Sequence, residues 1–272
     1  MTTMKILFTI ILLLSGATAL RAQFFYYPIP PAMADYTPNK KAHVKKCYEY
    51  KLRGNEKALS RMLEYGNGGL PTALYETGLR YNGDTGTVIT GSNNKYKDGK
   101  LIENNMVYHY QSDAGYTIVY TYDDSGRLYG KMVTDTDTAI YTYVYDKSGK
   151  IIRAEISLKT PDSKANTKAL PDGRCEYSYN AKDMLVQETS YTKDDEKQFT
   201  YQWEYNSEGQ IIKVTGTSAE EQVFYECLME YGKNNLLSKR TENIPGEETG
   251  IYVYEYCTDC RQSLMNNNKN DR

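Results

Sequence analysis

The chain has 272 residues and a formal net charge of −2, with 33 lysines and arginines against 35 aspartates and glutamates. Because the two signs are mixed along the sequence, it offers no basic surface for nucleic acid or for an anionic membrane. Tyrosine dominates the aromatic residues, with 28 tyrosines against 5 phenylalanines and one tryptophan. A tyrosine ring buries a large area, but its hydroxyl needs water or a partner, so we expect a thin, partly hydrated core.

The first 22 residues are typical of a secretory signal peptide. Lys5 supplies a positive charge, an apolar run covers residues 6–14, and small residues allow cleavage after Ala19 or Ala22. The apolar run is shorter than the ~20 residues of a membrane-spanning helix. The sequence therefore predicts a secreted or periplasmic protein that does not span a membrane once the signal is removed, with an uncleaved anchor as the alternative.

Residues 23–42 are rich in proline and are expected to be extended. The segment 43–52 resembles a strand. The segment 55–69 fits either a return strand that ends at Tyr65 or a helix with Asn55 as its N-cap, and the spacing of its tyrosine and glycine favours the strand.

A repeat of about 25 residues organises the region 43–260, which we predict to be one domain. Each unit has an anchor tyrosine directly before a turn, and two looser units have anchors at Tyr65 and Tyr96. The clear anchors are Tyr122, Tyr145, Tyr179, Tyr205, Tyr231 and Tyr256.

The unit that ends at Tyr145 shows how each repeat is expected to fold. Tyrosines alternate along 141–145, and a period of two places their rings on one face of a strand. Asp146 and Gly149 then fit a tight turn, in which glycine takes the left-handed position of a hairpin with a bulge. Lys150 and Ile151 open the return strand.

Three departures from this pattern carry further predictions. Asp183 and Asn235 stand where glycine is expected, and both residue types tolerate a left-handed backbone, so these turns should persist. Residues 160–173 form an insertion with proline, serine and aspartate, which predicts an exposed loop. The polar residues 261–272 are expected to be a flexible tail.

These patterns predict an all-β fold of antiparallel hairpin repeats, a meander or ribbon that forms an elongated, twisted or curled sheet. The unit from Tyr120 to Leu128 resembles the YD repeat of bacterial RHS proteins, and the resemblance covers about residues 100–260 well and 44–99 weakly. It implies hairpin ribbons, which in that family can enclose a cargo, attach to surfaces or bind carbohydrate. A closed shell needs many more units than this chain has, so the enclosing function is not expected here.

Four of the five cysteines allow specific predictions. Cys257 and Cys260 replace the aspartate and glycine of the last turn, which fits a disulfide, free thiols, or redox or metal chemistry. Cys175 and Cys227 lie on the aromatic face, in two repeats that are separated by one whole repeat. In a meander that is four strand spacings, roughly 19 Å, which exceeds the ~7 Å limit between the Cα atoms of a disulfide. We expect these two not to be paired with each other.

No catalytic motif is recognisable, and we predict no enzyme activity, no cofactor and no metal site. His43 and His109 are the only histidines, and each is expected to be a surface residue of a strand.

The leading functional interpretation is a secreted structural or protein-interaction module. One alternative is a carbohydrate-binding module that uses the same aromatic rings, and another is a periplasmic thiol-active factor that acts through Cys257 and Cys260. The partner would be a protein or a cell-surface polysaccharide. The candidate contact residues are Tyr120, Tyr143, Tyr177, Trp203, Tyr205 and Tyr254.

Overall fold

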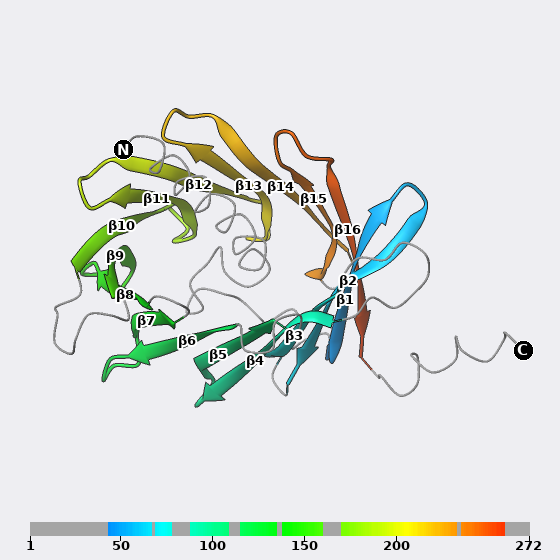
Figure 1. Ribbon diagram of the computed structural model, residues 1–272, viewed down its shortest axis with the longest axis horizontal. Coiled ribbons are helices and arrows are strands. Elements are labelled where there is room, and N and C mark those ends of the chain that lie inside the picture. The colour runs from blue at the N-terminus through cyan, green and yellow to red at the C-terminus, as the bar shows by residue number, and fades with distance from the viewer. Residues whose placement is uncertain are drawn as a thin grey trace, which may run out of the picture. The chain divides into compact units, whose positions relative to one another are not determined.

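Sixteen antiparallel strands follow one another in chain order, and each strand pairs with the next one (Figure 1). Their bounds are β1 (Lys46–Arg53), β2 (Glu56–Tyr65), β3 (Pro71–Thr77), β4 (Val88–Lys97), β5 (Lys100–Tyr108), β6 (Gly115–Tyr122), β7 (Leu128–Thr134), β8 (Thr138–Tyr145), β9 (Ile151–Lys159), β10 (Leu170–Tyr179), β11 (Leu185–Thr192), β12 (Lys197–Tyr205), β13 (Ile211–Ser218), β14 (Val223–Tyr231), β15 (Leu237–Asn243) and β16 (Gly250–Cys257).

This computed structural model describes residues 43–66, 69–77, 88–108, 115–134, 138–159, 170–232 and 235–258. They lie in the second of two compact units of the chain, Tyr36–Arg272. The expected signal peptide, the Pro-rich segment 23–42, the tail 261–272, His109 and Cys260 lie outside the described residues. The described residues include no helix that is long and apolar enough to cross a membrane.

The sheet closes on itself, because β1 pairs with β16 from Lys46 opposite Cys257 to Leu52 opposite Ile251. The predicted all-β antiparallel meander is confirmed, but the predicted elongated sheet is wrong, since the strands form a closed barrel. Closure gives the N–H and C=O groups of both edge strands a partner, which an open ribbon would leave free to pair with other chains.

The turn after Tyr145 has the predicted hydrogen bonds. The Gly149 N–H donates to the Asp146 carbonyl at 3.1 Å, and the Asp146 carboxylate accepts from the Lys150 N–H at 2.9 Å. Gly149 has a φ of +85°, and the pairing register shifts at Tyr145, as a bulge requires. Asp183 and Asn235 take the same left-handed position, with φ of +63° and +59°, so the prediction for these two turns is also confirmed.

The anchor tyrosines connect each hairpin to the one before it. From Tyr96 to Tyr256, each anchor donates its phenol to a backbone carbonyl on the preceding strand, at 2.6–2.8 Å. The pairs are Tyr96–Pro71, Tyr122–Leu101, Tyr145–Leu128, Tyr179–Ile151, Tyr205–Leu185, Tyr231–Ile211 and Tyr256–Leu237.

The basic residue that follows the turn glycine adds a second connection. The Arg127 guanidinium lies 5.0 Å from the centre of the Tyr145 ring in the next unit, and the Lys150 ammonium lies 5.8 Å from that of Tyr179. Such a cation over an aromatic face is attractive. The repeat motif is therefore a set of contacts between consecutive units as well as within each unit.

The core lies on the inner wall of the barrel, on the side of the anchor tyrosines. Side chains on the concave wall of a closed sheet converge, and the buried residues follow this alternation, with Tyr120, Tyr143, Val214 and Tyr254 among them. Side chains of the opposite alternation form the outer wall, where exposed residues such as Tyr129 lie.

Two further predictions are settled by the strand bounds. Residues 56–65 form β2, so the strand interpretation of the segment 55–69 is confirmed and the helix is excluded. The predicted loop 160–173 is too long at its C-terminal end, because β10 begins at Leu170. Leu170 and Pro171 pair with Leu158 and Ser157, which extends the hairpin beyond the point where proline content suggested a loop.

Candidate functional site

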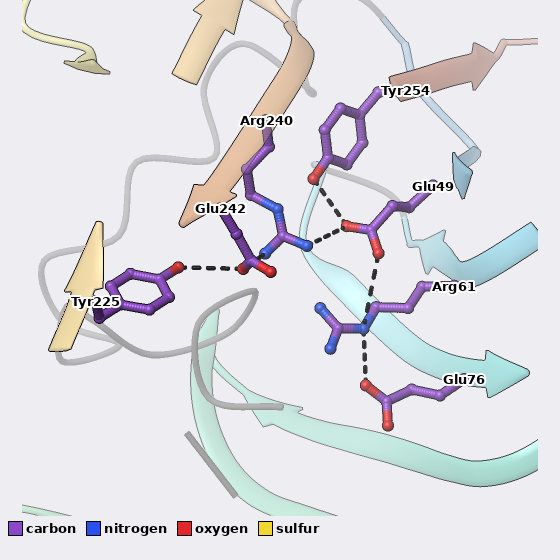
Figure 2. Close-up of polar contacts among 7 residues, drawn as sticks. All are labelled: Glu49, Arg61, Glu76, Tyr225, Arg240, Glu242 and Tyr254. Atoms are coloured by element: carbon purple, nitrogen blue, oxygen red, sulfur yellow. Dashed lines mark hydrogen bonds and ion pairs between the residues drawn. The ribbon is translucent and has the colours of Figure 1, made fainter. Parts of the chain in front are cut away.

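Five charged side chains gather on the inner wall where β1 and β16 close the barrel. We call these residues, with two tyrosines, the seam cluster. Figure 2 shows these side chains pointing toward one another. They come from six consecutive strands of the ring, β14 to β16 and β1 to β3. The seam cluster consists of Glu49, Arg61, Glu76, Arg240, Glu242, Tyr225 and Tyr254.

Glu49 on β1 is the centre of the seam cluster and is 0% exposed. One carboxylate oxygen accepts a hydrogen bond of 3.0 Å from the Arg240 Nη2 and another of 2.8 Å from the Tyr254 hydroxyl. The other oxygen lies 3.9 Å from the Arg61 Nε. Glu49 is thus held from β15, from β16 and from β2, the strands on both sides of the closure.

Glu76, Glu242 and Tyr225 complete the polar contacts of the two arginines in the seam cluster. The Arg61 Nε donates to the Glu76 carboxylate at 2.7 Å, and the Arg240 Nη1 lies 2.9 Å from the Glu242 carboxylate. The Tyr225 hydroxyl donates to that same Glu242 oxygen at 3.1 Å. Three carboxylates therefore share two guanidinium groups inside the wall.

The electrostatics keep both arginines charged. Burial lowers the pKa of Arg240, but the charges of Glu49, Tyr254 and Glu242 more than offset it, so the pKa lies well above its usual value. The same balance raises the pKa of Arg61. Burial, followed by the Glu49 charge, raises the pKa of Tyr254 well above its usual value. None of these three groups can exchange a proton near neutral pH, so the arrangement suits closure of the barrel better than acid–base chemistry.

Two further residues of the inner wall, Glu188 and Lys131, interact electrostatically. Glu188 on β11 lies opposite Tyr177 and Tyr201 in the pairing register, and the Lys131 ammonium on β7 lies 4.1 Å from the centre of the Tyr141 ring. Burial raises the pKa of Glu188 to about 7, although the Lys131 charge and a hydrogen bond with Cys175 act in the opposite direction. Among the described residues it is the one carboxyl group whose pKa is raised in this way.

The six predicted contact residues all lie on the inner wall. Tyr120, Tyr143, Trp203 and Tyr254 are buried, with Trp203 only 3% exposed, whereas Tyr177 and Tyr205 are half-buried. The structure brings Tyr254 into the seam cluster and places Tyr143 and Tyr177 in the electrostatic surroundings of Glu188. These rings form no outward patch, and a role for them in binding stays a prediction.

Sequence reasoning missed Glu49, Arg61 and Arg240. A signal was present, because Glu49 stands between Cys47 and Lys51 in an alternating run, on the side that the alternation turns inward. A charged residue at an inward position requires a partner of opposite charge. The identity of that partner could not be read from the sequence, since Arg240 lies 191 residues away.

The cysteines divide into two groups. Cys257 is disulfide-bonded, and its predicted partner Cys260 lies outside the described residues. Cys47, Cys175 and Cys227 are free and buried, which confirms that Cys175 and Cys227 are not paired with each other. Burial raises the pKa of Cys47 to about 12 and that of Cys227 to about 11, so these thiols stay protonated and unreactive at neutral pH.

The described residues contain no group of three or more histidine, cysteine, aspartate or glutamate side chains that could hold a metal ion. The polar groups of the inner wall thus comprise the ion network at the seam and the electrostatically coupled Glu188 and Lys131.

Comparison with known proteins assigns no family to this chain. No family model and no curated protein matches it. Among solved structures, a porin-like protein from Bacteroides uniformis is similar at 11% identity and a TM-score of 0.48, over 79% of this chain and 98% of that one.

Two other solved structures are more distant. A DUF1329 family protein from Desulfovibrio piger is similar at 9% identity and a TM-score of 0.28, over 86% of this chain and 96% of that one. The structure of TcdB2-TccC3 matches 75% of this chain at 14% identity and a TM-score of 0.22, and the match spans only 14% of that chain. None of these similarities is close enough to transfer a function.

Proposed function

We propose that the chain is a secreted, non-enzymatic barrel whose outer wall lies in water and which serves as a structural or protein-interaction module. The observation that carries this proposal is the row of ion pairs on the outer wall. They join Lys46 to Glu64, Lys95 to Glu103, Arg153 to Glu155, Arg174 to Glu176, Lys213 to Glu226 and Lys239 to Glu230.

The distribution of polarity is the reverse of that in a barrel embedded in lipid. Such a barrel turns an apolar band outward, and a lysine or arginine at the middle of that band costs ~2–4 kcal/mol. Here the outer side chains of most strands include charged residues, while most of the buried apolar and aromatic side chains lie on the inner wall. The charged outer wall therefore suits contact with water and not with lipid.

The inner wall favours the interaction module over the carbohydrate-binding alternative from the sequence. Sugar rings stack on open aromatic faces, and Trp203 is enclosed by the wall, with the Tyr201 ring centre 6.4 Å from its own. The thiol-active alternative acts through Cys257 and Cys260, of which Cys257 is disulfide-bonded. The described free thiols add no accessible thiol of low pKa, because they are buried and their pKa values are raised. We therefore assign the protein a role in binding a partner and not in catalysis.

The proposal is tested by measuring whether the protein stays in aqueous buffer or associates with lipid. The full chain, exported by the cell that expresses it, should stay in solution in buffer without detergent and should not float with phospholipid vesicles in a density gradient. A glycan array should show no saturable binding. A protein that needs detergent, or that floats with the vesicles, would contradict the proposal.

A further inference from the structure

Three neighbouring strands form a continuous part of the outer wall on which no outer side chain carries a charge. Lys131 is the one charged residue within β6, β7 and β8 and it points inward, whereas the flanking strands bear Glu103 on one side and Arg153 and Glu155 on the other. We call the outer side of β6 to β8 the uncharged wall.

The uncharged wall is ordered in rows that run across the three strands. The pairing register aligns a threonine row next to an apolar row. The threonine row is Thr117, Thr134 and Thr138, and the apolar row is Val119, Met132 and Ile140. The surface faces outward, since Thr134 is exposed, Met132 is 39% exposed and Tyr129 at the strand end is 57% exposed.

We propose that the uncharged wall is a contact surface for a second copy of this chain. In a two-fold contact the same patch meets itself, so any charged residue near the axis faces a like charge from the other copy. Like charges brought together in an interface cost several kcal/mol. The uncharged wall is the described run of three outer strands on which this cost is absent.

Threonine makes the same surface self-complementary. A hydroxyl group both donates and accepts a hydrogen bond, so a threonine row can pair with its own copy, which a row of lysine or of glutamate cannot do. The neighbouring apolar row supplies area that loses water on contact. A charged partner of another kind would find no complementary charge on the uncharged wall.

The size of the uncharged wall sets the strength of the contact. Three strands at ~4.8 Å spacing and roughly 27 Å length cover roughly 400 Å². A standard interface buries about 800 Å² per partner. The dimer is therefore weak and forms at high local concentration, which fits a module that meets further copies on a surface and does not form a permanent pair.

Sedimentation velocity from micromolar to millimolar concentration tests this inference. The wild-type chain should shift reversibly from monomer to dimer. Met132→Glu, at the centre of the apolar row, should raise the dimer dissociation constant at least about tenfold, because it places two carboxylates near the axis. Thr134→Glu is a second variant at an exposed position, with the same expected result.

Leu228→Glu is the matched control. Leu228 is 40% exposed against 39% for Met132, and it lies on the outer wall of β14 opposite Lys213. This control should dimerise as the wild type does, and circular dichroism should show the same fold in all variants. A wild type that stays monomeric at millimolar concentration, or a Met132→Glu variant that dimerises like the control, would overturn the inference.

The inference rests on the proposal that the outer wall lies in water, and the outcomes separate the two. A chain that needs detergent or floats with vesicles overturns both. A chain that stays in buffer without detergent, yet remains monomeric, overturns the dimer alone and leaves the interaction module to other surfaces.

Discussion

The Tyr145 hydroxyl donates a hydrogen bond of 2.6 Å to the carbonyl oxygen of Leu128 at the start of β7. Both residues occupy fixed positions of the repeat motif, in successive units. Since the same bond recurs from Tyr96 to Tyr256, it accounts for tyrosine in place of phenylalanine at the anchor position. The motif therefore specifies how one hairpin docks on the next.

Replacement of Tyr145 by phenylalanine removes this bond and keeps the ring. We expect the free energy of unfolding to fall by ~0.5–1.5 kcal/mol, the net value of such a bond, since the carbonyl of the buried Leu128 loses its phenol donor. Urea denaturation followed by circular dichroism measures it. Tyr129→Phe, on the exposed outer wall, should change stability by less than ~0.5 kcal/mol; equal effects of the two changes would refute the docking role.

The seam cluster predicts a larger effect. Glu49→Gln leaves the buried Arg240 guanidinium without its charged partner on β1, and breaking a buried pair in this way costs ~3–5 kcal/mol. The control is Glu255→Gln, which removes the exposed pair of Glu255 with Lys57 on the same closure, worth ~0–1 kcal/mol. If both variants unfold at the same urea concentration, the seam cluster does not hold the closure together.

The local parts of the fold could be predicted from the sequence because their causes are local. The alternation before Tyr145 and the left-handed position at Gly149 each involve a few neighbouring residues. Even the turns with Asp183 and Asn235 in place of glycine could be predicted, since aspartate and asparagine tolerate the left-handed backbone conformation.

Closure and the seam cluster could not be predicted in the same way. The repeat pattern is the same in an open ribbon and in a ring, and the contact that distinguishes them joins β1 to β16, with Glu49 and Tyr254 205 residues apart. The burial of the candidate contact rings could not be predicted for the same reason. Alternation places Trp203 on one face, but only closure turns that face inward and encloses it.

Two substitutions at the left-handed turn position should have different effects on stability. At Gly149 an added Cβ would meet nothing within 4 Å, so Gly149→Ala should cost ~1–2 kcal/mol through the backbone conformation alone. Asp183 holds the equivalent position with a side chain, and its exposed pair with Lys150 is worth little. Asp183→Gly should therefore keep or raise the melting temperature, and a fall as large as that of Gly149→Ala would show that the side chain matters more than the backbone.

Glu188 predicts a dependence of stability on pH. The pKa of Glu188 is about 7 in the folded protein against an ordinary value of 4.5, so the folded state holds the proton more tightly than the unfolded chain does. The contribution of Glu188 to the free energy of unfolding is fully present below about pH 4.5 and is lost as the pH rises to about 7. The loss is on the order of 1–3 kcal/mol.

Glu188→Gln should flatten the stability profile between these two pH values, because glutamine keeps a neutral, polar side chain beside Tyr177 and Lys131. Urea denaturation at a series of pH values measures the profile. Glu204→Gln, on the exposed outer wall of β12, should keep the wild-type slope. A Glu188→Gln profile that retains this slope would assign the pH dependence to other carboxyl groups.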